Sequence, residues 1–344
     1  MNTKIVKTNG QSIPEYELKQ AAEILKSGGL VVFPTETVYG LGGNATDAEA
    51  AKKIYAAKGR PSDNPLIIHV AKPEDAEKYA FTSPTYYKLA KAFMPGPLTV
   101  ILDKKDTIPF SVTGGLESVA VRCPSHPIAR QLIEEAGIPI AAPSANLSGK
   151  PSPTCARHVI DDLNGRVDMI IDGGSCEIGL ESTIVKLNGN SATLLRPGAI
   201  TADALRCVCD SVEIAPAVLE QLKADERPLS PGMKYKHYAP SVPLILIDGE
   251  NDRVTEFLKK EQHDKKCAIL CYHEELALLE NKNVIDVGAS GDLEAQAGAL
   301  FAALRDADLL GIDVIYAHLP PKDGLGLALY NRMIRAAAHT VIKV

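Results

Sequence analysis

The feature that most constrains the fold is an alternation of short apolar runs with helical stretches, which occurs twice along the chain. The runs are rich in β-branched residues, as in "LVVF", "PLIIHV" and "STIVKL", and stretches such as "DAEAAKKIYAAK" have helical periodicity. This alternation predicts sheets covered by helices. We expect a mixed α/β domain first, and after residue 243 a smaller doubly wound parallel sheet.

The length and a proline-rich stretch predict two domains. A chain of 344 residues exceeds the usual size of one domain. Its periodicity weakens between residues 211 and 243, where "ERPLSPGMKYKHYAPSVP" contains four prolines. We therefore predict domains at 1–210 and 244–344, joined by a linker at 211–243. The Lys, Tyr and His residues of the linker suit either a solvated basic tether or a segment that folds over a site.

Composition excludes several classes of protein. The formal net charge of −6 argues against a protein that coats RNA. No stretch approaches the ~18 apolar residues that span a bilayer, and the first twenty residues lack the apolar core of a signal peptide, so we expect a cytoplasmic protein without membrane contact. The seven cysteines follow no paired zinc spacing, which predicts reduced, mostly buried thiols.

The common nucleotide and hydrolase motifs are missing from the sequence. The chain contains no Walker motif, no H-E-x-x-H and no G-x-S-x-G. The glycines of "YGLGGNA", residues 39–45, miss the dinucleotide spacing and favour a tight turn. The second domain has no G-x-G-x-x-G after its first strand, and we assign it no chemistry.

The stretch "KGRPSDNPLIIHV" carries the first candidate site residues. Lys58 and Arg60 close a helical stretch, where cations either complement the helix dipole or bind an anion. Two prolines stiffen the exit, and Asn64 and His69 add directed hydrogen-bonding groups beside an apolar strand. A strand histidine on its own is usually a satisfied core group.

Later loops repeat this pattern of cations and small polar groups. Arg122 ends an apolar strand, where its side chain either snorkels or receives a carboxylate. Ser144 and Asn146 follow "IPIAA", and Ser182 and Arg196 follow in later loops; such groups contact phosphates or serve as caps and turns. None of these loops pairs a nucleophile with a base. This combination of cations and small polar groups therefore suits a reaction between two bound molecules, which the protein would promote by positioning them and neutralising their charge.

Seven ordered stretches resemble the threonylcarbamoyl-AMP synthase family in its long, two-domain form. They are "FPTETVYGLGGNA", "KGRPSDNPLIIHV", "MPGPLTVIL", "VAVRCP", "PIAAPSANLSGKPSPT", "GLESTIV" and "LRPGAI". The K-x-R and S-x-N signature of the family is present as Lys58/Arg60 and Ser144/Asn146. The resemblance extends through "SPGMKYKHYAP" into the second domain and covers nearly the whole chain.

The resemblance implies a fold and a reaction. The implied first domain is a twisted, YrdC-like mixed sheet with a concave basic cavity, and the second is Rossmann-like. The implied enzyme is a nucleotidyltransferase, L-threonylcarbamoyladenylate synthase. It joins L-threonine, bicarbonate or carbon dioxide, and ATP, and it releases pyrophosphate. The product feeds threonylcarbamoylation of the adenosine beside the anticodon in tRNAs that read codons beginning with A, through hand-off to a transferase.

The family also implies roles for individual residues. The implied catalytic residues are Lys58, Arg60, Ser144 and Asn146. The implied ATP-binding residues are Lys58, Arg60, Asn64, Ser118, Ser144, Ser152, Arg196, Tyr235, His237 and Tyr238. The implied L-threonine-binding residues are Thr35, His69, Arg122, Ala142 and Ser182. Mg²⁺ is expected to arrive on ATP, with no protein side chain as its ligand.

Two rival functions and several questions stay open at this stage. One rival is an RNA-binding module without chemistry, which the acidic balance and the 5% aromatic content disfavour. The other is a different ATP-dependent acyl or carbamoyl transfer enzyme on the same scaffold. The choice between bicarbonate and carbon dioxide, direct RNA binding, the oligomeric state and the role of the second domain do not follow from the sequence.

Overall fold

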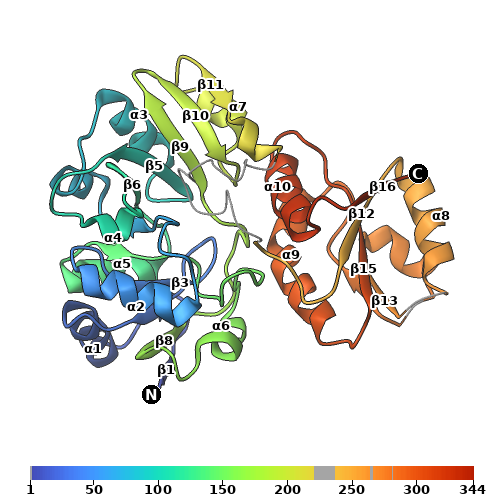
Figure 1. Cartoon of the computed structure of the whole chain (residues 1–344), viewed down its shortest axis with the longest axis horizontal. Helices are drawn as coiled ribbons and strands as arrows, with labels where there is room; N and C mark the ends of the chain where they lie inside the picture. Colours follow the sequence, from blue (N-terminus) through green and yellow to red (C-terminus); the bar gives the residue numbers. More distant parts are fainter. Residues whose placement is uncertain (1, 221–236, 264–265, 281) are drawn as a thin grey trace. The chain divides into compact units, whose positions relative to one another are not determined.

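The chain forms two compact units in the computed structural model, which describes residues 2–220, 237–263, 266–280 and 282–344 (Figure 1). Most of the first unit lies between residues 1 and 234, and most of the second between 235 and 344. Two short loops, 149–152 and 178–180, belong to the second unit. The predicted limits of the domains and of the linker stay a prediction.

The described part of the first unit contains a large mixed sheet. Its strands run in the order β1-β8-β2-β3-β7-β4-β6-β5-β9-β10-β11. The strands are β1 (Lys4–Lys7), β2 (Val31–Phe33), β3 (Gly40–Asn44), β4 (Ile67–His69), β5 (Leu98–Asp103), β6 (Ser118–Arg122), β7 (Ile140–Ala141), β8 (Met169–Asp172), β9 (Thr183–Asn188), β10 (Ser191–Arg196) and β11 (Val212–Ile214). Parallel pairs such as β4–β6 alternate with antiparallel pairs such as β5–β6, which confirms the predicted mixed sheet.

Helices surround this sheet in the first unit. They are α1 (Glu15–Lys26), α2 (Ala48–Lys58), α3 (Pro84–Phe93), α4 (Phe110–Thr113), α5 (Pro127–Ala136), α6 (Ala156–Leu163) and α7 (Ala202–Arg206), with 3₁₀ turns η1 (Pro73–Lys78) and η2 (Pro216–Val218). α1 and α5 pack against each other, and their apolar sides join β2, β7 and β8 in one core cluster (Figure 1). Leu25, Phe33 and Leu132 are fully buried there. This core fixes the sheet from which the site residues project.

One sequence prediction about this sheet was wrong. The glycines of "YGLGGNA" form strand β3, with Val31 opposite Gly42, and not a tight turn. A Cβ at Gly42 would lie 2.8 Å from side-chain carbons of both Ile140 and Phe33. The glycine therefore lets neighbouring side chains approach the backbone of β3.

The second unit is a parallel sheet of five strands between helices. Its order is β14-β13-β15-β12-β16, and neighbouring strands pair in parallel. The elements are β12 (Leu244–Asp248), α8 (Asn251–Glu261), β13 (Cys267–Cys271), η3 (His273–Leu278), β14 (Val284–Asp286), α9 (Leu293–Asp308), β15 (Val314–His318), α10 (Gly326–Ala336) and β16 (Val341–Lys343). α8 covers one face of the sheet, and α9 and α10 cover the other (Figure 1). This arrangement confirms the predicted doubly wound domain.

Two further features bear on the sequence predictions. β11 and η2 lie inside the range predicted as a linker, and β11 pairs with β10. Within the described ranges, no helix is both long and apolar enough to cross a membrane. All seven cysteines are free thiols and five of them are buried, as predicted.

Candidate active site

The ammonium group of Lys58 joins two loops that are distant in sequence. Asp47 caps the start of α2, and Gly59, with φ of 63°, ends the helix directly after Lys58. The Nζ of Lys58 donates to the main-chain oxygen of Ser144, to that of Asn146 at 2.6 Å, and to the Asn146 Oδ1 at 3.3 Å. The structure therefore brings the K-x-R helix end and the S-x-N loop into direct contact.

The Ser144 hydroxyl completes this contact. Its Oγ donates to the Asn146 Oδ1 at 2.5 Å, and Asn146 is buried. A β-bridge between Gly40 and Ser144 ties the loop to β3. The Lys58 ammonium at the end of α2 thus lies against the small polar groups of a loop that the sheet holds. This arrangement is suited to binding phosphate oxygens.

The Arg60 guanidinium folds back along its own loop. Its Nε and Nη2 lie 3.4 Å from the main-chain oxygen of Asn64, and Nη2 lies 3.2 Å from that of Pro65. The side chain of Asn64 is buried, and its Oδ1 has no hydrogen-bond partner among the described residues. A buried acceptor without a donor is costly, so Asn64 is suited to accept a hydrogen bond from a ligand.

A buried ion pair lies at the end of β6. The Nη2 of Arg122 is 2.6 Å from the Oε1 of Glu36, and both side chains are 5% exposed. The Arg122 Nε has no hydrogen-bond partner within the described part of the chain. One donor of a buried guanidinium is therefore unused, and a carboxylate is the ligand that such a donor prefers.

His69 lies beside Arg122 because β4 and β6 pair in parallel register. Its Nδ1 is 3.3 Å from the main-chain oxygen of Ile140, and its ring meets Phe33 edge to face. Burial, and then the charge of Arg122, lower the pKa of His69 to about 3. His69 is therefore a neutral imidazole near pH 7, with directed polar atoms and no charge.

Ser182 is hydrogen-bonded both to Thr99, the neighbour of Arg122 on β5, and to Arg196. Thr99 pairs with Arg122 across β5 and β6, and its Oγ1 is 2.7 Å from the Ser182 Oγ. The Arg196 Nε donates to the Ser182 main-chain oxygen at 3.0 Å, and its Nη2 donates to the Ser182 Oγ at 3.1 Å. Arg122, Thr99 and Arg196 on three strands, with Ser182 directly before β9, thus form one polar row.

Thr35 and Ala142 lie on two loops, which follow β2 and β7. The Thr35 Oγ1 donates to the main-chain oxygen of Val38 at 2.6 Å and accepts from the Val38 amide at 3.2 Å, which closes a turn after β2. The amide of Ala142 donates to the main-chain oxygen of Ile67 at 2.9 Å, beside His69 on β4.

The other predicted residues that the structure describes come from the start of β6 and from the second unit. Ser118 begins β6, four residues before Arg122, which places it roughly 13 Å away along the strand. Ser152, His237 and Tyr238 belong to the second unit, where the Tyr238 ring stacks on Phe301. Tyr235 lies outside the described residues.

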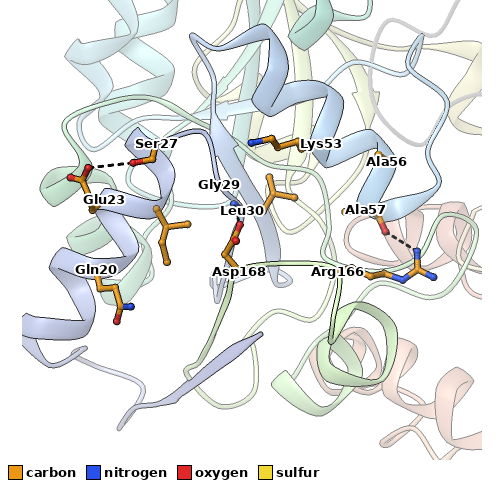
Figure 2. Close-up of a pocket in the computed structure, with 11 residues that line it drawn as sticks. Gln20, Glu23, Ser27, Gly29, Leu30, Lys53, Ala56, Ala57, Arg166 and Asp168 are labelled. Atoms are coloured by element: carbon orange, nitrogen blue, oxygen red, sulfur yellow. Dashed lines mark hydrogen bonds between the residues drawn. The ribbon is translucent and has the colours of Figure 1, made fainter. Parts of the chain in front are cut away.

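A large pocket on the first unit is lined by none of the predicted residues. Its volume is about 590 Å³, within the range of small-molecule sites. Figure 2 shows Gln20 and Glu23 of α1 and Ser27, directly after this helix, on one side of it, and Ala56 and Ala57 of α2 on the other. The remaining lining residues are Ile24, Gly29, Leu30, Lys53, Arg166 and Asp168.

No group of three or more His, Cys, Asp or Glu side chains is placed to hold a metal ion in the described ranges. The site residues instead supply cations, hydroxyls and amides, which bind anionic oxygens directly.

Two residues of the site were missed by the sequence analysis. Glu36 pairs with Arg122, and Thr99 bonds to Ser182. An Arg inside a run as apolar as "SVAVRC" is seldom buried without a counter-charge, so the sequence did indicate that some acid was needed. Nothing in it indicated Glu36, which is 86 residues away.

Comparison with known families accounts for both units. Residues 23–198 match a family model described as "Telomere recombination", of the Sua5, YciO and YrdC proteins. Residues 200–338 match the model described as "Threonylcarbamoyl-AMP synthase, C-terminal domain".

Full-length relatives agree with these matches. The chain is 44% identical to the threonylcarbamoyl-AMP synthase of Bacillus subtilis over 339 residues, which covers 98% of this chain and 97% of the relative. It is 45% identical to that of Pyrococcus abyssi over 341 residues, which covers 97% and 98%. The crystal structure of P. abyssi Sua5 in complex with L-threonine superposes with a TM-score of 0.90 at 43% identity, over the whole of both chains.

The mixed sheet, its polar row and these matches define a two-unit α/β enzyme of the nucleotidyltransferase class, as predicted. The chain belongs to the threonylcarbamoyl-AMP synthase family in its two-domain form.

Proposed function

We propose that this protein is an L-threonylcarbamoyladenylate synthase. It joins L-threonine, bicarbonate or carbon dioxide, and ATP, and releases pyrophosphate. The observation that carries the proposal is the contact of Lys58 with the loop of Ser144 and Asn146. Membership of the family and the threonine complex of the P. abyssi relative support it.

The reaction needs no protein nucleophile. The amino group of threonine adds to carbon dioxide and loses a proton, which gives a carbamate. A carbamate oxygen then attacks the α-phosphorus of ATP, and pyrophosphate leaves with the electrons of the broken P–O bond. The protein's task is to position both substrates and to neutralise the phosphate charge.

The phosphate groups are assigned to the cations of the site. Lys58, Arg60 and Arg196 supply positive charge, and Ser144 and Asn146 supply small polar contacts. The unpartnered Oδ1 of Asn64 accepts a hydrogen bond from the nucleotide. Mg²⁺ carried by ATP would offset part of the phosphate charge, and no side chain of the protein is assigned to hold it. Contacts of Ser118, Ser152, Tyr235, His237 and Tyr238 with the nucleotide stay predictions, as does the concave shape of the cavity.

Threonine is assigned to the polar row around Arg122. The free Nε of Arg122 binds the substrate carboxylate, which a buried guanidinium prefers to other ligands. Neutral His69 provides a polar atom without competing for that carboxylate. Thr35, Ser182 and the backbone at Ala142 complete the binding site.

The product is a mixed anhydride and has to be consumed by a second enzyme. We place the reaction first in the formation of threonylcarbamoyladenosine in tRNAs that read codons beginning with A, followed by transfer of the threonylcarbamoyl group to the tRNA. This placement rests on the family, and it makes the cytoplasm the expected location.

The test is threonine-dependent release of pyrophosphate from ATP and bicarbonate. We expect Lys58→Ala to lower the rate by about 100-fold or more, the usual effect of removing a group that stabilises developing charge. Arg122→Ala should raise the KM for threonine. Lys53→Ala is the matched control, because Lys53 lies on the same helix and donates to the main-chain oxygen of Gly28, away from the loop of Ser144 and Asn146. Wild-type turnover that ignores threonine would refute the proposal.

A further inference from the structure

We infer that Glu36 is a positioning residue for the threonine site, which holds Arg122 so that its Nε is presented to the substrate carboxylate. The inference rests on the proposed function, because it names the residue that prepares Arg122 for threonine. Glu36 contacts no substrate in this assignment. Its role is exerted through the guanidinium group.

Glu36 is itself fixed from two sides. Its Oε1 accepts from the Arg122 Nη2 at 2.6 Å, and its Oε2 accepts from the amide of Ser125 at 3.2 Å. The residue before it, Thr35, closes the turn with Val38. The carboxylate therefore has little freedom, and it anchors the guanidinium at one defined nitrogen.

Arg122 needs such an anchor because of its length. An unanchored Arg side chain has rotamer entropy that a ligand would have to overcome on binding. β6 fixes only the backbone of Arg122, between His69 on β4 and Thr99 on β5. The side-chain hydrogen bonds of these two residues go to Ile140 and to Ser182. Within the described part of the chain, Glu36 supplies the hydrogen bond that orients it.

The charges of this cluster also fit a zwitterionic substrate. The pair of Glu36 and Arg122 has no net charge, and burial keeps His69 neutral. An amino acid without net charge can therefore enter without leaving a buried charge uncompensated. The bond to Glu36 uses Nη2 and leaves Nε without a partner among the described residues.

The experiment compares Glu36→Ala, Glu36→Gln and Glu36→Asp in the pyrophosphate assay, with the KM for threonine and the KM for ATP measured separately. Gln keeps the reach of the side chain and loses its charge, whereas Asp keeps the charge and is one methylene shorter. If Glu36 acts by position, Ala and Asp raise the KM for threonine on the order of tenfold, the lower end of what losing an orienting partner costs at metal sites. Gln keeps an acceptor for the Arg122 Nη2 but loses the second acceptor for the Ser125 amide and the charge, so it raises the KM for threonine less than Ala and Asp do, and the KM for ATP is unchanged in all three.

Glu275 provides the matched control. It is a carboxylate of the second unit with 5% exposure, paired with His318 at 2.9 Å. Glu275→Ala should lower the thermal unfolding temperature without a selective change in the KM for threonine. If Glu36→Ala does not fold, the order of Gln and Asp decides the question, because both keep an acceptor at this position.

The outcomes separate this inference from the proposed function. A wild-type enzyme without threonine-dependent turnover refutes the proposed function. An active wild type whose threonine KM is unchanged in Glu36→Ala and Glu36→Asp overturns the inference alone. The inference is also overturned if the KM for threonine rises less in Glu36→Asp than in Glu36→Gln, since the charge of the side chain and not its position would then matter. It is likewise overturned if the KM for threonine and the KM for ATP rise together.

Discussion

The Nζ of Lys58 lies 2.6 Å from the main-chain oxygen of Asn146, a residue 88 positions later in the chain. Lys58 is 2% exposed, so this contact replaces water at a buried ammonium group. The same nitrogen bonds to the main-chain oxygen of Ser144. Lys58 is therefore a structural link between α2 and the loop after β7, in addition to its proposed role toward phosphate.

Replacing Lys58 should destabilise the fold as well as the reaction. Lys58→Met keeps most of the apolar stem but removes the donor to both main-chain oxygens. Leaving buried acceptors unpaired typically costs about 1–3 kcal/mol. We expect the free energy of unfolding to fall by that amount in chemical denaturation.

Lys53→Met is the comparison for this stability measurement. Lys53 is exposed, five residues earlier on α2, and its substitution should change the free energy of unfolding by less than about 0.5 kcal/mol. Equal effects of the two substitutions would show that the link between α2 and the loop adds nothing to stability.

The sequence predicted the elements better than it predicted the contacts. Lys58 at a helix end and Arg122 at a strand end follow from local patterns, and both positions are confirmed. The partners of these residues are 86 to 88 positions away. Such pairs are set by the packing of the sheet, which periodicity does not encode, so the resemblance to a family was needed to group Lys58 with Ser144.

The pKa of His69 gives the protein a testable pH dependence. Burial, followed by the charge of Arg122, lowers this pKa from 6.5 to about 3. The unfolded chain therefore binds a proton at His69 between these pH values and the folded chain does not. The neutral imidazole of His69 therefore contributes to the free energy of unfolding above pH 6.5. This contribution is lost as the pH falls from 6.5 toward 3, by up to about 1.4 kcal/mol per pH unit.

The measurement is chemical denaturation of the wild type and of His69→Gln at several pH values from 7 down to 4. The carboxylates of the protein contribute equally to both curves, so the difference between them isolates His69. We expect the wild type to lose more stability than the variant over this range. Parallel curves would mean that His69 titrates alike in the folded and unfolded chains.

Strand β3 shows why one local pattern misled the sequence analysis. Glycines usually indicate turns, because they tolerate dihedral angles that other residues avoid. Gly42 does not lie in a turn; it lies inside β3 opposite Val31. Its lack of a side chain is used for close packing, and the neighbours that require it, Phe33 and Ile140, come from two other strands.

Gly42→Ala should therefore destabilise the first unit by overpacking. The added Cβ would lie 2.8 Å from Ile140 Cγ2, 2.8 Å from Phe33 Cε1 and 3.0 Å from the main-chain oxygen of Val31. All three atoms belong to buried strands, so relief requires the sheet to shift, at a typical cost of about 1–3 kcal/mol. Gly291→Ala is the control, because a Cβ there meets no atom within 4 Å. We expect thermal unfolding at a lower temperature for Gly42→Ala only; an unchanged unfolding temperature would mean that β3 has room for a side chain.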